Sequence, residues 1–216
     1  MNKEATIHTI EVEKAIAVIR LRERGKLLSV VEALVKGGIR CVEITMTVPG
    51  AIDAIAELGG LVKEDVILGA GTVLDAETAS RAIDAGARFI VSPVFRREIV
   101  ERCNARGAVV IPGCFTPTEI YTAWKAGADA VKVFPAGVLG ISFFKSVRGP
   151  LPDLKLIPTG GVTVENAATW IEAGAVAVAV GTDLVDKAAV ESAGYRIITD
   201  RASRLVASLK KDVSGS

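Results

Sequence analysis

Short runs of β-branched and small apolar residues alternate with longer amphipathic stretches along nearly all of this 216-residue chain. Eight such runs predict strands, at 15–20, 41–46, 66–73, 88–93, 108–113, 130–135, 154–161 and 175–182. Helical patterns lie between most of them, at 26–37, 51–64, 75–86, 95–106, 116–127 and 163–173. Because strand–helix alternation is typical of parallel sheets, eight strands favour a closed barrel over an open sheet.

Glycines mark the repeat of this pattern. Gly86, Gly127 and Gly174 each follow a helical stretch and precede a strand within the phrase AGA, as expected for a left-handed helix cap. We therefore predict an α/β fold, a (β/α)8 TIM barrel with an N-terminal helix and a C-terminal helix at 194–211, forming one domain over residues 1–216. An open Rossmann or flavodoxin-like sheet is the alternative, but residues 21–25 do not carry the GxGxxG fingerprint.

The composition limits where the protein works and what it binds. Mean hydropathy is +0.41, yet no uncharged run approaches the roughly 18 apolar residues of a spanning helix. The N-terminal segment is punctuated by charges and has no apolar signal core. Net charge is +1, with both signs interspersed, which argues against a nucleic-acid partner. We expect a soluble cytoplasmic protein with neither a membrane nor a nucleic-acid partner.

The supply of metal-binding side chains is small. Cys41, Cys103 and Cys114 are far apart in the sequence, and His8, near the N-terminus, is the single histidine. This pattern argues against a disulfide framework, a metal site and a histidine-based triad. Chemistry in this chain would then rely on lysine, carboxylates, arginine, hydroxyls and backbone dipoles.

Polar residues gather where the expected strands end. In a (β/α)8 barrel the active site lies at the carboxyl ends of the strands. The polar residues at those positions are Arg20, Glu43, Thr45, Thr47, Thr72, Ser92, Lys132, Thr159 and Thr182.

Alternation along two strands assigns a face to the two charged residues among them. Val42 and Ile44 suit packing under helices, so Glu43 should point into the barrel; in the same way Val131 faces outward and Lys132 inward. Such burial of charge is costly. The pair is either a structural ion pair or a catalytic amine with its acid/base partner. Burial would lower the pKa of the lysine and favour a neutral nucleophile, and the nearby carboxylate would oppose that shift.

Two glycine-rich loops end the last two expected strands. Gly160 and Gly161 follow Thr159, and Gly181 precedes Thr182. The loops after strands seven and eight bind phosphate in many barrels of this type, through close backbone N–H groups and a helix N-terminus. Thr163 can cap the following helix. The alternative is a pair of ordinary turns, in which glycine is also common.

The motifs together are highly specific. They are EITMTVP (43–49), GAGTV (69–73), SP (92–93), IPG (111–113), TPTE (116–119), KVFPA (132–136), PTGGV (158–162) and GT (181–182), in this order. From about residue 10 to 209 the chain resembles the family of 2-keto-3-deoxy-6-phosphogluconate (KDPG) aldolases, which also covers 4-hydroxy-2-oxoglutarate aldolases.

The resemblance implies a class I aldolase that needs neither cofactor nor metal, because a lysine forms a covalent Schiff base. It implies Lys132 as that lysine and Glu43 as the proton shuttle. The implied substrate-binding residues are Arg20, Thr72, Pro93, Phe134 and Thr159. The implied phosphate-binding residues are Gly160, Gly161, Gly181 and Thr182. It also implies a homotrimer.

The expected reaction is cleavage of KDPG to pyruvate and glyceraldehyde 3-phosphate, with 4-hydroxy-2-oxoglutarate as a further expected substrate. The galactonate epimer is a second hypothesis for the substrate, mildly disfavoured by Thr159. Two different classes of function stay open as well: a phosphate-sugar isomerase or epimerase built on the same barrel, and an inactive barrel that acts as a binding module.

Besides Thr182, which stands where the family often has serine and keeps the hydroxyl, the chain departs from the family pattern in two places. Thr47 stands where one branch has arginine, so the resemblance leaves carboxylate binding to Arg20, Thr72 and backbone. Residues 136–140 lack an acidic group found in some members. Both departures concern the choice of substrate and leave the lysine chemistry unchanged.

Overall fold

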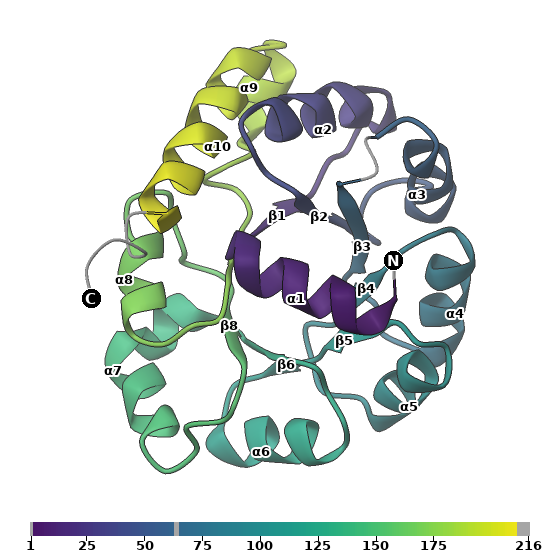
Figure 1. Ribbon diagram of the computed structural model, residues 1–216. Coiled ribbons are helices and arrows are strands. Elements are labelled where there is room, and N and C mark those ends of the chain that lie inside the picture. Colours follow the sequence, from purple (N-terminus) through teal and green to yellow (C-terminus); the bar gives the residue numbers. More distant parts are fainter. Residues whose placement is uncertain (1, 63–64, 211–216) are drawn as a thin grey trace.

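The computed structural model describes residues 2–62 and 65–210 and shows a parallel α/β fold (Figure 1). The strands are β1 (Ala15–Ile19), β2 (Cys41–Thr45), β3 (Ile67–Gly71), β4 (Phe89–Val91), β5 (Val109–Ile111), β6 (Gly113–Cys114), β7 (Val131–Val133), β8 (Leu156–Pro158) and β9 (Val178–Val180). The α-helices are α1 (Lys3–Glu13), α2 (Leu27–Lys36), α3 (Ala51–Gly59), α4 (Ala76–Asp84), α5 (Arg97–Ala105), α6 (Pro117–Lys125), α7 (Ala136–Arg148), α8 (Ala167–Glu172), α9 (Lys187–Glu191) and α10 (Tyr195–Lys210). The single domain expected over 1–216 includes residues 1, 63–64 and 211–216, which lie outside the described residues.

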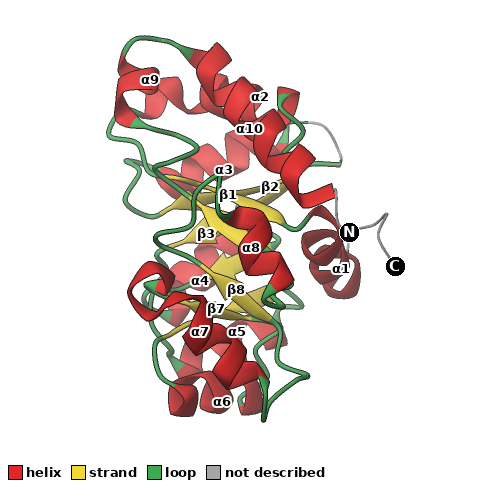
Figure 2. Ribbon diagram, turned by 90° about the vertical axis from the view of Figure 1, so that its left-hand side faces the viewer, coloured by secondary structure: helices red, strands yellow, loops and turns green. Residues whose placement is uncertain are grey.

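The strands form two parallel sheets. Six are ordered β5-β4-β3-β2-β1-β9, and three are ordered β6-β7-β8. The six-stranded sheet curls as a half-barrel, with the helices outside the strands (Figures 1 and 2). Between the sheets, Thr159 bridges Ala179 in parallel, and the Val176 amide donates to the Leu156 carbonyl at 3.1 Å. The predicted parallel α/β class is confirmed.

The run expected as one strand over 108–113 is divided. β5 ends at Ile111 and β6 begins at Gly113, with Pro112 between them. Proline has no N–H to donate to a neighbouring strand, so it interrupts the ladder. Its carbonyl still accepts a hydrogen bond from the Lys132 amide at 2.9 Å, which keeps the segment aligned with β7.

Three helical segments differ from the prediction. The sequence pattern does not predict α7, over Ala136–Arg148, because Gly137 and Gly140 are poor helix formers. In the structure Gly140 departs from helical geometry. α9 lies within 183–193, a connection with no predicted structure. α8 begins at Ala167, later than predicted, because residues 164–166 form a turn that Thr163 caps by accepting from the Asn166 amide at 3.1 Å.

The core has an inner and an outer layer, as alternation along the strands requires. The inner cluster contains Ile10, Ile16, Val18, Cys41, Ile67, Phe89, Val91, Val109, Ile111, Ala130, Ile157, Ala177 and Ala179. The outer cluster, between strands and helices, includes Val42, Ile44, Val131 and Val133. Side chains from one strand therefore serve both layers, which confirms the predicted outward faces of β2 and β7.

Helix α1 lies across one end of the two sheets (Figure 1). Ile10 of this helix is fully buried in the inner cluster. Ion pairs fix both ends of the helix: Lys3 with Asp129 at 3.0 Å and Glu11 with Lys155 at 2.5 Å. His8 is exposed on the same helix, as predicted. Among the described helices, none has the length and apolar character needed to span a bilayer.

The inner layer generates a stability prediction at Phe89. Its ring is fully buried and occupies space that a side chain at Gly69 would need. Phe89→Ala removes that packing and leaves a cavity, so we expect a loss of about 3–5 kcal/mol in the free energy of unfolding. Urea unfolding followed by circular dichroism measures it. Leu74→Ala is the matched control, since Leu74 is 51% exposed; an equal effect of both variants would contradict this account.

Candidate active site

Lys132 and Glu43 lie at the centres of β7 and β2 and are nearly inaccessible to solvent, with exposed fractions of 3% and 1%. Their chain neighbours Val131, Val133 and Ile44 pack in the outer cluster. Both charged side chains therefore point toward the inner layer of the strands, as the alternation predicts.

Burial shifts both groups toward their uncharged forms. Burial raises the pKa of the Glu43 carboxyl, while the positive charges of Lys132 and Arg20 partly oppose the rise. Burial lowers the pKa of the Lys132 ammonium; Glu43 opposes that shift and Arg20 adds to it. A neutral amine next to a protonated carboxyl is the state required for nucleophilic attack with a proton donor at hand.

Glu43 and Thr159 have buried oxygens without hydrogen-bond partners. Among the described residues, neither carboxyl oxygen of Glu43 has a hydrogen-bond partner, and the Thr159 hydroxyl has none. A Cβ at Gly71 would collide with the Glu43 carboxyl, so this glycine makes room for it. Buried polar atoms without partners are rare in folded proteins. The arrangement suits side chains that form their hydrogen bonds to a bound molecule.

Aromatic and proline side chains surround the lysine. The Nζ of Lys132 lies 5.0 Å from the centroid of the Phe134 ring. Phe134 and Pro93 are both half-buried. Pro93 follows β4, and its carbonyl lies where a Cβ of Gly113 would be. That Pro93 and Phe134 form walls of the substrate pocket, as the resemblance implies, stays a prediction.

Thr72, at the end of β3, has an unusual backbone. Its φ is 58°, a left-handed conformation that a β-branched residue rarely adopts. Strain of this kind is concentrated at functional sites. The observation supports a binding role for Thr72, whose side chain is half-buried.

A chain of hydroxyl groups connects β2 to β1. The Thr45 hydroxyl donates to the Ile19 carbonyl at 3.0 Å, immediately before Arg20. The Thr45 and Thr47 hydroxyls lie 2.6 Å apart. Because the Thr45 proton goes to Ile19, the Thr47 proton must go to Thr45. In this arrangement Thr47 has no proton to donate to a carboxylate.

The loop after β8 is held by side chains that the motifs do not include. Gly160 and Gly161 have φ values of 79° and 86°, which only glycine adopts readily. The side-chain amide of Asn166 donates to the Gly161 carbonyl at 3.0 Å. The Asp183 carboxylate accepts from the backbone amide of Val164 at 2.8 Å. Asn166 could have been found from its spacing, three residues after Thr163, which is typical of a capping pair.

Arg20 lies with the loop after β9. Its guanidinium Nη1 is 3.0 Å from the position that a Cβ of Gly181 would occupy. Arg20 and Thr182 also line one pocket of about 180 Å³. The structure thus places together a cation, a glycine backbone and a hydroxyl. This combination can bind an anion such as phosphate.

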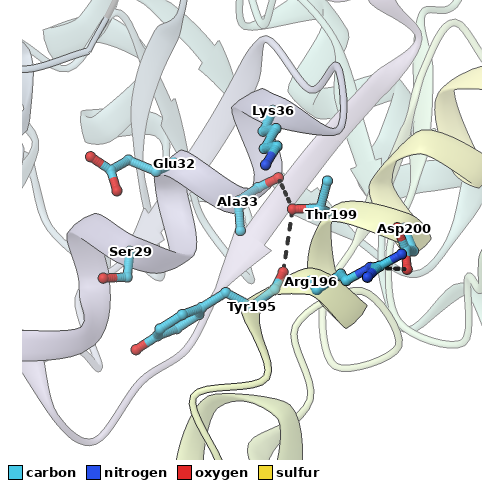
Figure 3. A pocket seen from close by; sticks show the side chains of 8 residues that line it. All are labelled: Ser29, Glu32, Ala33, Lys36, Tyr195, Arg196, Thr199 and Asp200. Atoms are coloured by element: carbon cyan, nitrogen blue, oxygen red, sulfur yellow. Dashed lines mark hydrogen bonds and ion pairs between the residues drawn. The ribbon is translucent and has the colours of Figure 1, made fainter.

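A larger pocket lies elsewhere, between α2 and α10 (Figure 3). It encloses about 610 Å³, and the Thr199 hydroxyl donates to the Ala33 carbonyl there at 3.0 Å. None of the predicted site residues lines it. Lys36 and Asp200 in its wall are exposed, so charge in this pocket is solvated, in contrast to Lys132 and Glu43.

Within residues 2–62 and 65–210, no group of three or more His, Cys, Asp or Glu side chains is placed to hold a metal ion. The site instead combines a buried amine, a buried carboxyl, unpaired hydroxyl and carboxyl oxygens, and an anion-binding edge. Such a set can form and hydrolyse an imine with a carbonyl compound while holding an anionic group at a distance.

Comparisons with known proteins agree with this geometry. Residues 7–200 match the family model described as KDPG and KHG aldolase. The 2-dehydro-3-deoxy-phosphogluconate aldolase of Treponema pallidum is 35% identical, over 88% of this chain and 90% of its own length. The 2-dehydro-3-deoxy-6-phosphogalactonate aldolase of Escherichia coli is 34% identical, over 83% and 91%.

A solved structure extends the comparison to mechanism. The KDPG aldolase of Legionella pneumophila, with pyruvate captured at low pH as a covalent carbinolamine intermediate, is 30% identical. It superimposes with a TM-score of 0.85 over 91% of this chain and 96% of its own. This chain is therefore a lyase of the aldolase class, and it belongs to the KDPG and KHG aldolase family.

Proposed function

We propose that this aldolase cleaves 2-keto-3-deoxy-6-phosphogluconate to pyruvate and glyceraldehyde 3-phosphate through a Schiff base on Lys132. One observation carries the proposal: among the described residues, Lys132 is the only buried lysine and Glu43 the only buried carboxylate, and they interact electrostatically. Cleavage of 4-hydroxy-2-oxoglutarate to pyruvate and glyoxylate would use the same two groups.

The reaction begins when the neutral Lys132 amine attacks the C2 ketone and forms a carbinolamine. Glu43 donates a proton to the departing hydroxyl, water leaves, and an iminium forms. The Glu43 carboxylate then takes the C4 hydroxyl proton, the C3–C4 bond breaks, and the electron pair of that bond moves into the iminium to give an enamine. Glyceraldehyde 3-phosphate departs. Protonation of the enamine at C3 and attack of water on the imine release pyruvate and regenerate Lys132.

The two charged ends of the substrate would be bound at different edges. The phosphate would lie against the backbone of Gly160, Gly161 and Gly181, with Thr182 and Arg20 beside it. The contact of Arg20 with Gly181 supports a role at this end. Thr72 and nearby backbone would then bind the pyruvyl carboxylate, because the Thr47 proton is held by Thr45.

Thr159 would influence which configuration at C4 of the substrate the enzyme accepts. Its buried, unpaired hydroxyl would contact the aldehyde portion of the substrate, and Pro93 and Phe134 would line the pocket. Relatives named for the gluconate and the galactonate compounds have nearly equal identity, at 35% and 34%. Cleavage of the galactonate epimer is therefore the second candidate activity.

The proposal includes the wider setting of the enzyme. The two sheets would form one closed (β/α)8 barrel, with β5 and β6 counted as one strand, in a single domain over 1–216. The proposal includes a homotrimer, and exposed apolar side chains such as Val94 and Phe115 are available for an interface between subunits. Three buried free cysteines, at 41, 103 and 114, agree with the reducing cytoplasm. The covalent lysine mechanism would need neither cofactor nor metal.

Trapping with pyruvate and borohydride tests the proposal directly. We expect intact mass spectrometry to detect one reduced pyruvyl adduct on the wild type and on Lys125→Met, which replaces an exposed lysine of α6. Lys132→Met should form no adduct and should not cleave KDPG. Absence of an adduct on the wild type would refute the Schiff-base mechanism. That result is the one expected of an isomerase, an epimerase or an inactive barrel.

Glu43→Gln should separate the electrostatic effect of the carboxyl on Lys132 from its role as a proton donor. Because Glu43 opposes the lowering of the Lys132 pKa from its usual 10.5, its neutralisation lowers that pKa further. The acid limb of adduct formation against pH should therefore move to lower pH. Turnover should fall by roughly 10²–10⁴-fold through loss of the proton donor. Glu32→Gln, on exposed α2 surface, should change neither; a shift of the limb to higher pH would contradict the assigned coupling.

Arg20 and Arg22 line the same pocket and form a matched pair of test positions. Arg20→Gln removes a charged hydrogen-bond donor from the proposed phosphate, so we expect KM for KDPG to rise by about 10- to 100-fold. Arg22→Gln should have little effect. Steady-state kinetics, with pyruvate trapping as a control for imine formation, checks this. Equal effects of the two variants on KM would contradict the proposed role of Arg20 in binding the phosphate.

A further inference from the structure

Two backbone hydrogen bonds connect the segment after Lys132 to the loop after β8. The Ala136 amide donates to the Thr159 carbonyl at 2.8 Å, and the Gly137 amide donates to the Gly160 carbonyl at 2.7 Å. Ala136 and Gly137 are in the first turn of α7, where amide donors lack partners within the helix. The loop after β8 supplies those partners.

These bonds fix the direction in which the loop amides point. In a trans peptide the carbonyl of one residue and the N–H of the next point in opposite directions. Since the Thr159 and Gly160 carbonyls face α7, the N–H groups of Gly160 and Gly161 face away from it. Neither N–H donates to another residue in the described part of the chain. Two adjacent donors are thus oriented together, as an anion requires.

The approach of the two segments depends on glycine at 137. A Cβ there would lie 3.0 Å from the Cα of Gly161 and 3.3 Å from the carbonyl oxygen of Gly160. Gly160 and Gly161 need glycine for their positive φ, but Gly137 has no positive φ. The backbone conformation at 137 is therefore open to any residue, and only the contact with Gly161 requires that no side chain be present.

From this contact we infer that Gly137 is a positioning residue. It seats the Gly160 and Gly161 amides against the substrate phosphate and sets their distance from Lys132, which is five positions earlier on the same segment. The inference rests on the proposed function and adds a determinant of specificity: Gly137 fixes the reach between the imine carbon and the phosphate.

Gly137→Ala tests the inference, with Val138→Ala as control because Val138 is 74% exposed. Alanine favours a helix more than glycine does, so the helix itself is not weakened. The new methyl must move Gly161 by a few tenths of an ångström. Because this displacement weakens the hydrogen bonds that the Gly160 and Gly161 N–H groups would donate to a charged phosphate, we expect about a tenfold weaker Kd for inorganic phosphate, measured by ³¹P NMR titration.

The substrate comparison provides the second readout. The ratio of kcat/KM for KDPG to that for unphosphorylated 2-keto-3-deoxygluconate should fall by about the same factor. Pyruvate adduct formation should stay at the wild-type level in both variants. An unchanged phosphate Kd, or equal losses for both substrates and for the pyruvate adduct, would overturn the role of Gly137. If the wild type forms no pyruvate adduct, the proposed function fails, while the phosphate titration still decides this inference.

Discussion

The site depends on the burial of one ammonium and one carboxyl group inside a layer of apolar strands. Each group alone would be costly there. Together they reduce that cost, because each can approach its neutral form and each stabilises the charge of the other. The pair can thus hold a readily transferred proton in the inner layer of the strands. A conventional surface ion pair, such as Arg40 with Asp65 at 2.8 Å, has no comparable effect, because water screens it.

The arrangement of the strands separates stability from chemistry along their length. The inner cluster is apolar where α1 covers it, with Ile10, Ile16 and Phe89 fully or almost fully buried. Toward the carboxyl ends, inward positions become Glu43, Lys132 and Thr159. The apolar half anchors the strands, so the polar half can contain unpaired oxygens and a strained residue such as Thr72. The marginal stability of proteins makes such a division useful.

Much of this was predictable because period-two alternation is a local property. It assigned Glu43 and Lys132 to the inward face, and the expected strands were located within two or three residues of their observed bounds. Tertiary contacts account for what was missed. The two glycines of α7 conceal a helix whose first-turn amides are satisfied by another loop, the ladder break at Pro112 reflects a missing donor, and the support of the loop after β8 by Asp183 joins segments 19 residues apart. No local pattern encodes the contacts that α7 and Asp183 make with distant segments, whereas the break at Pro112 follows from the residue itself.

Two glycines of strand β3 leave space that side chains of neighbouring strands fill. At Gly69 the missing side chain is replaced by the ring of Phe89, and at Gly71 by the carboxyl of Glu43. The volume of the inner layer is thus shared across strands, and each glycine and its neighbour form one unit of shape. Evolutionary or engineered change in this layer must consequently occur in pairs. A library that varies residue 43 or 89 while holding 69 and 71 fixed would leave the space of any smaller side chain unfilled, and that space can be used only when both members vary together.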